Sequence, residues 1–140
     1  MGTINWQRVI LGGIAAGIIV FAIDFVTFGF VFNQMVNAAY AALGRNFEEG
    51  GPLSLVFFIG TSLLIGIVAV WLYAAMRPRF GPGPRTAVLA GLTVWLLASV
   101  FPGLGMIASL FPASLVIASI GTGLIESLVA TQAGAYMYRE

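Results

Sequence analysis

Hydrophobic residues gather in four long runs along the chain, separated by short polar or proline-rich stretches. The runs cover residues 9–32, 53–76, 87–110 and 113–137. Each is long enough to cross a bilayer as a helix, which takes roughly 20 apolar residues. None shows the short alternating strands of a membrane barrel. The pattern predicts an all-α, integral membrane four-helix bundle that forms one transmembrane domain over residues 1–140.

The composition favours a membrane protein and excludes most enzyme chemistry. Apolar residues make up 60% of the chain and charged residues only 8%, whereas soluble domains carry about 25% charge. The chain has no Cys and no His, which removes thiolate nucleophiles, imidazole bases and the usual zinc ligands. Phosphate-loop, dinucleotide and nucleic-acid motifs are also absent. We therefore expect no catalytic residue, no metal, no cofactor and no nucleic-acid partner.

Prolines and glycines set the expected helix ends. Pro52 and Pro112 suit the first position of the second and fourth helices. Residues 77–85 hold three prolines and two glycines, so we expect a connector that is not helical. Pro102 should kink or end the third helix, and the first should run on until Gly44. The predicted helices are about 6–43, 53–76, 86–110 and 112–138.

The arginines predict the topology. Four spans place both termini and the middle connector on one side, which carries five of the six arginines: Arg8, Arg77, Arg79, Arg85 and Arg139. The other side has Arg45, followed by Glu48 and Glu49. By the positive-inside rule both termini are expected in the cytoplasm. Arg77, Arg79 and Arg85 are either only this topology signal or candidate contacts for anionic lipid head groups.

The two halves of the sequence resemble each other. Pro52-Leu-Ser-Leu-Val56 recurs as Pro112-Ala-Ser-Leu-Val116, and Gly60-Thr-Ser-Leu63 as Gly121-Thr-Gly-Leu124. The first and third runs share a weaker match, Leu11-Gly-Gly-Ile14 and Leu89-Ala-Gly-Leu92. We therefore expect two tandem helical hairpins, over residues 1–76 and 85–140, related by an axis along the membrane normal.

Two acids, Asp24 and Glu126, lie inside the predicted spans. At 100° per residue each shares a helix face with small or hydroxyl-bearing residues. The first and last helices of an up-and-down bundle are neighbours, so the two carboxyl groups are expected to be buried and close. No span holds a basic residue, which leaves a retained proton, a bound cation or a donor from another subunit. Alternatively, each acid only hydrogen-bonds a neighbouring helix. The candidate polar site comprises Asp24, Glu126, Thr27, Ser119 and Thr122, with Trp95 as a further partner.

Three short segments carry a resemblance to known proteins: Asn5-Trp6, Leu11-Gly-Gly and Leu89-Ala-Gly-Leu-Thr-Val-Trp95. With the four-span plan, the chain resembles small four-helix bacterial membrane proteins of unassigned function, which implies a multi-pass protein of the inner membrane. Two functions remain open. The first is a non-catalytic subunit or scaffold that packs through small-residue helix faces in a homo-oligomer or a larger membrane complex. The alternative is a small proton- or cation-linked transporter or channel that uses Asp24 and Glu126.

Overall fold

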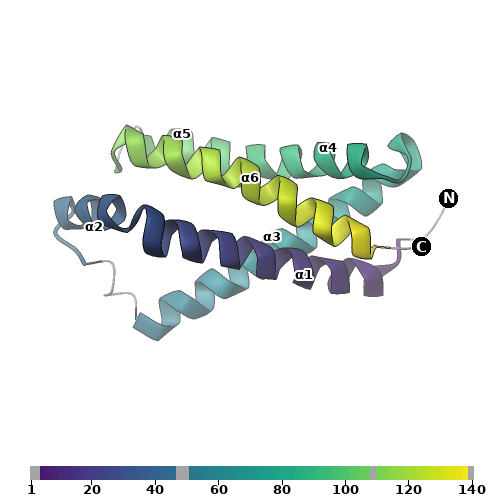
Figure 1. Cartoon of the computed structure of the whole chain (residues 1–140), viewed down its shortest axis with the longest axis horizontal. Coiled ribbons are helices and arrows are strands. Elements are labelled where there is room, and N and C mark those ends of the chain that lie inside the picture. The colour runs from purple at the N-terminus through teal and green to yellow at the C-terminus, as the bar shows by residue number, and fades with distance from the viewer. Residues whose placement is uncertain (1–3, 47–50, 108–109, 139–140) are drawn as a thin grey trace.

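The structure is a computed structural model of the whole chain, and it describes residues 4–46, 51–107 and 110–138 (Figure 1). Within these ranges the protein is helical, and no residue forms a strand. The elements are α1 (Trp6–Val26), the π-helical turn η1 (Thr27–Val31), α2 (Asn33–Ala42), α3 (Gly51–Phe80), α4 (Pro84–Trp95), the π-helical turn η3 (Leu96–Val100), α5 (Phe101–Ile107) and α6 (Ala113–Met137). Three residues of the topology prediction, Glu48, Glu49 and Arg139, lie outside the described residues.

Four helical segments are long and apolar enough to cross a membrane. They are Trp6–Val31, Gly51–Phe80, Pro84–Met106 and Ala113–Met137. These segments agree with the four hydrophobic runs of the sequence. The all-helical fold with four spans is thus confirmed, and the protein is a multi-pass membrane protein whose helices contact lipid.

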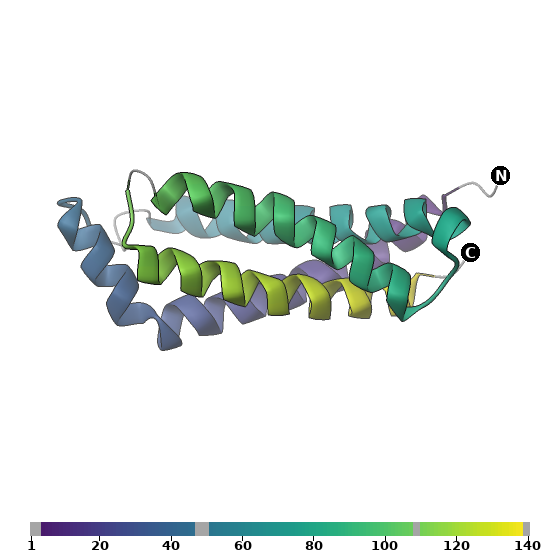
Figure 2. The same ribbon diagram turned by 90° about the horizontal axis from the view of Figure 1, so that it is seen from above.

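The spans form an antiparallel up-and-down bundle. α1 packs on α3 and α6, α4 packs on the same two helices, and α3 and α6 also touch each other. The start of α1, the end of α6 and the α3–α4 turn lie at one end of the bundle, which we call the terminal end (Figure 2). The opposite end carries α2, and we call it the α2 end.

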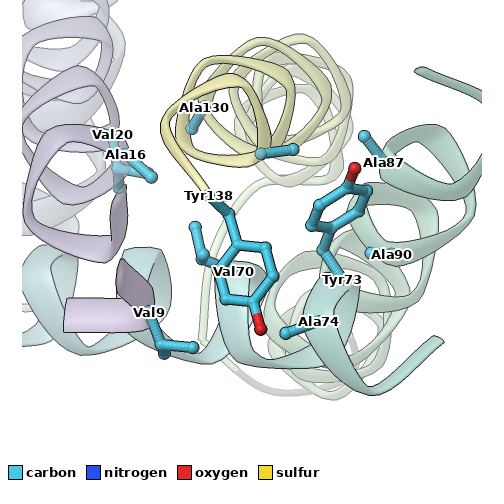
Figure 3. Packing of buried hydrophobic residues seen from close by; sticks show 11 residues of the cluster. Val9, Ala16, Val20, Val70, Tyr73, Ala74, Ala87, Ala90, Ala130 and Tyr138 are labelled. Atoms are coloured by element: carbon cyan, nitrogen blue, oxygen red, sulfur yellow. The ribbon is translucent and has the colours of Figure 1, made fainter. Parts of the chain in front are cut away.

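The main core lies near the terminal end and is built from small and β-branched residues around two tyrosines (Figure 3). Glycines bring the helices close together. A Cβ on Gly66 of α3 would strike the backbone of Gly13 and Gly17 in α1. α1 and α3 therefore meet backbone to backbone, an arrangement typical of membrane helices. The glycine face of α1 is used inside the chain.

The first helix is not continuous, contrary to the prediction of one helix over 6–43. Its hydrogen bonding changes to a π-helical turn in η1, where the Phe32 N–H donates to the Thr27 carbonyl at 2.7 Å. The Asn33 side-chain amide donates to the Gly29 carbonyl, a local bond of the kind that competes with regular helix bonding. α2 then leans away from the bundle axis (Figure 2). The predicted stop at Gly44 is correct, because Gly44 has a φ of 69° just beyond α2.

The non-helical connector predicted over residues 77–85 needs correction, as does the alternative that Pro102 ends the third helix. α3 continues through Pro78 to Phe80, so residues 77–80 are helical and the turn begins at Gly81. Pro78 cannot donate to the carbonyl one turn back, but only two helical residues follow it, and the Gly81 N–H still donates to the Arg77 carbonyl at 2.8 Å. Pro102 does not end the third span. The turn η3 directly before α5 accommodates the proline, as π-turns often do at helix irregularities.

Candidate functional site

Asp24 of α1 and Glu126 of α6 form the candidate site. Their carboxyl groups lie in hydrogen-bond contact with each other. Glu126 is only 9% exposed, and Asp24 is half-buried. The two acids therefore join the first and the last spanning helix inside the membrane region.

The register of α1 against α6 explains this contact. A Cβ on Gly12 would lie 2.7 Å from the Gly134 carbonyl oxygen, so these two residues are directly opposite. Counting 12 residues along each helix from this point puts Asp24 level with Thr122. Glu126 is then one turn away. Side chains lean toward the N-terminus of their own helix, so in antiparallel helices these two lean toward each other and close the gap.

Two of the three predicted hydroxyl partners of the acids donate to their own helix. Ser119 donates to the Leu115 carbonyl and Thr122 to the Ala118 carbonyl, each at 2.9 Å and within α6. Trp95 donates its indole N–H to the Ile120 carbonyl at 2.9 Å. Thr27 is half-buried in η1, and its backbone carbonyl accepts from Phe32. The structure thus brings the two acids together, while these three donor groups serve the backbone of α6.

The described residues bring no basic side chain to the pair. The ionisable residues of α3 and α4 all lie toward the terminal end: Tyr73, Arg77, Arg79 and Arg85. The other ionisable residues of the described helices are Arg8 in α1, Tyr40 in α2 and Tyr136 in α6. Each acid therefore faces the other acid and apolar or hydroxyl-bearing neighbours.

The three arginines proposed for lipid contact have different surroundings. Arg79 and Arg85 are exposed, whereas Arg77 is half-buried. Its guanidinium carbon lies 5.9 Å from the centre of the Tyr73 ring and 5.2 Å from that of Tyr138. Arg77 therefore forms part of a cation–π cluster, and only the other two are open to head groups.

We call Tyr73, Arg77 and Tyr138 the tyrosine–arginine cluster, which sequence reasoning missed. The two rings meet edge to face, with centres 6.1 Å apart. Tyr73 accepts from the Gly83 N–H and Tyr138 from the Asn5 N–H, each at 3.2 Å. The spacing of four residues between Tyr73 and Arg77 was the available signal, because such residues are neighbours on a helix.

The described residues contain no group of three or more acidic, His or Cys side chains that could hold a metal ion. A calcium or magnesium site takes six or more oxygens in most proteins, and two carboxyl groups supply four. What this arrangement can do chemically is hold and release a proton.

Comparison with known proteins does not place this chain in a family. No family model, no curated protein and no solved structure matches it. The case for a function therefore rests on the geometry of the bundle and of the acid pair.

Proposed function

We propose that this protein is a small proton-linked membrane transporter or channel, in which Asp24 and Glu126 bind and release the proton. The observation that carries the proposal is the contact between two carboxyl groups within the spans. A hydrogen bond between carboxyl groups needs a proton on one of them, because an ionised carboxylate only accepts. The pair therefore titrates as one unit, and ionisable groups inside membranes typically mark ion or proton pathways.

A proton suits the pair better than a metal cation does. Further oxygen ligands would have to come from water, from backbone carbonyls or from the Ser119 and Thr122 hydroxyls, whose protons go to α6 carbonyls. No other acid lies in the described spans. The pair thus offers a proton two well-matched acceptors, whereas a cation would need ligands beyond the two acids.

We also propose that the bundle consists of two repeated hairpins. Supporting this, α1 packs on α3 as α4 packs on α6, and α3 lies between α1 and α4 as α6 does. The close contacts also correspond. Gly13 meets Ile67 between α1 and α3, and Gly91 meets Leu128 between α4 and α6. In the proposed alignment these are equivalent residues.

The acid pair departs from this repeat. Asp24 aligns with Pro102, and Glu126 aligns with Ile65. The contact between α1 and α6 therefore carries two carboxyls, whereas the equivalent contact between α4 and α3 carries none. We infer that divergence of the two halves created a single site. The arginines favour an orientation with the terminal end in the cytoplasm, and the resemblance to small bacterial proteins favours an inner membrane.

Infrared spectroscopy of the reconstituted protein tests the proton directly, without knowledge of a substrate. We expect the carbonyl band of a protonated carboxyl group at neutral pH, which disappears in alkaline buffer. The double change Asp24→Asn and Glu126→Gln should remove the band, while circular dichroism shows a folded bundle. Thr61→Ala, which changes an exposed hydroxyl of α3 outside the candidate site, should keep it. Absence of a titrating band in the unmodified protein would refute the proton site.

Proteoliposome flux then tests whether the proton moves. A pH-sensitive dye inside the vesicles should report faster collapse of a pH gradient with the unmodified protein than with Glu126→Gln. The matched control is Thr61→Ala at an exposed position of α3, where the hydroxyl donates to the Phe57 carbonyl of its own helix. Unchanged proton flux in Glu126→Gln, in a protein that still shows the infrared band of Asp24, would mean that the acid pair is not the proton pathway.

A second candidate function, a membrane subunit or scaffold, is favoured by the first turns of α3. Residues 51–57 are exposed in succession, so no side of this segment is covered by the chain itself. A helix of another subunit could pack there. Cross-linking in native membranes, followed by mass determination in mild detergent, tests this role. A scaffold should associate and tolerate Glu126→Gln, whereas a strictly monomeric protein rules out the homo-oligomer.

A further inference from the structure

The bundle is packed differently on the two sides of the acid pair. In α1 the buried residues run from Val9 to Val20 and stop before Asp24. In α3 they begin at Ser62, and in α4 they end at Val94. The main core therefore lies between the acid pair and the terminal end. On the α2 side, burial is found in a small cluster where α2 covers the start of α6 and where η3 and α5 pack on α6 at Gly123 and Gly103.

The terminal half is closed by direct contact. Gly13 and Gly17 meet α3 and Gly12 meets α6, with backbone against backbone. Such contacts leave no room for water between the helices. The tyrosine–arginine cluster covers the end of this half and links it to the backbone at Asn5 and Gly83.

The other half is open by comparison. Phe21 and Phe58 still stack across α1 and α3, with ring centres 5.5 Å apart. Ile59 and Leu55, which continue the buried face of α3 toward the α2 end, are 38% and 50% exposed. The third span, in contrast, stays packed on α6: a Cβ on Gly123 would strike the Ser99 side chain, and one on Gly103 would lie 2.9 Å from Ile120. The opening therefore lies along α3. α3 diverges from the neighbouring helices at this end (Figure 1).

The face of α6 that carries Glu126 is also more polar toward the α2 end than toward the terminal end. From Glu126 toward the α2 end, its face carries Thr122 and Ser119. Toward the terminal end it carries Ala130 and Gly134, both buried. A hydroxyl whose proton is used can still accept from water with its lone pairs. The face is therefore wettable on one side of the pair and apolar on the other.

We infer that water reaches the Asp24–Glu126 pair from the α2 end, and that the terminal half is the dry barrier. The water route is inferred from packing alone, and it rests on the proposed function only for the claim that the water delivers a proton. It means that the structure represents a state open toward one side of the membrane. Release toward the other side would require the glycine contacts between α1, α3 and α6 to separate.

Cysteine labelling tests the route, because the chain has no Cys of its own. Ser119→Cys and Ala130→Cys place single thiols on the Glu126 face, one on each side of the acid. A charged methanethiosulfonate is added to both sides of vesicles that hold each variant. Ser119→Cys should react about tenfold or more faster than Ala130→Cys, because the reactive thiolate forms in water and not in an apolar core.

Controls separate water from lipid and from misfolding. Ile125→Cys lies next to the acid on an exposed face and should stay unreactive if that face meets lipid. Denaturation in detergent should make all three thiols react. If Ser119→Cys does not fold, Thr122→Cys replaces it. Fast labelling of Ala130→Cys, or no labelling of either Ser119→Cys or Thr122→Cys, would overturn the inferred water route. The labelling rate does not depend on proton binding. The labelling test can therefore fail while the infrared test succeeds, and the infrared test can fail while the labelling test succeeds.

Discussion

Replacing Gly66 by alanine tests the closest helix contact in the bundle. The added Cβ would lie 2.7 Å from the Cα of Gly17 and closer still to the Gly13 carbonyl oxygen. These are backbone atoms of α1, which no side-chain rotation can move aside. The helices must therefore separate.

The size of the effect follows from this geometry. Carbon atoms pack at about 3.5–4.0 Å, so α1 has to withdraw by about 1 Å, which forfeits much of the attraction along the contact. Overpacking of this kind costs about 1–3 kcal/mol. Alanine also removes the entropic cost of a glycine within a helix, about 0.5–1 kcal/mol. We expect the free energy of unfolding to fall by about 1–2 kcal/mol.

Gly60→Ala is the matched control, because Gly60 lies in the same helix and has no atom within 4 Å of the new Cβ. It should be neutral or stabilise the protein by up to about 1 kcal/mol. Unfolding in mixed micelles with rising dodecyl sulfate, followed by tryptophan fluorescence, measures both variants. Equal stability of the two variants would refute backbone contact between α1 and α3.

Two further predictions concern the core and the topology. The Thr131 side chain is 0% exposed and its hydroxyl has no hydrogen-bond partner. In the same unfolding assay, Thr131→Val should therefore leave the free energy of unfolding unchanged or raise it by up to about 1 kcal/mol. A clear loss of stability would show that the hydroxyl is bonded. Reporter enzymes fused after Tyr138 or inserted beside Gly81 should report the cytoplasm, and a fusion after Arg45 the outside; the reverse pattern would contradict the arginine argument.

Hydrophobicity predicts the spans well because helix length is set by the thickness of the bilayer. The face of the acids also follows from sequence, because the 100° step and the up-and-down order place Asp24 and Glu126 on neighbouring helices. The donor choice of Ser119 and Thr122 does not follow. It depends on whether a neighbouring group lies nearer than the carbonyl one turn back in the same helix. Only three-dimensional distances decide this.

Proline and asparagine positions show a second limit. Pro78 is typical of a helix break, yet α3 continues through it for two more residues, to Phe80. In contrast, the break at Phe32 occurs without any proline and depends on the π-turn of η1. The packing of α2 against the start of α6 favours the break at Phe32.

The joining of the first helix to the last has a consequence for biosynthesis. Membrane helices enter the bilayer in order from the N-terminus, so α1 arrives while α6 is still unmade. Until then Asp24 lacks its partner, and an acidic residue at the centre of a lone helix disfavours insertion by about 2.5–3.5 kcal/mol. The apolar residues around it in α1 must offset this during synthesis. A chain that stops before Ala113 leaves this carboxyl without Glu126 in the bilayer, so the site is completed only with the last helix.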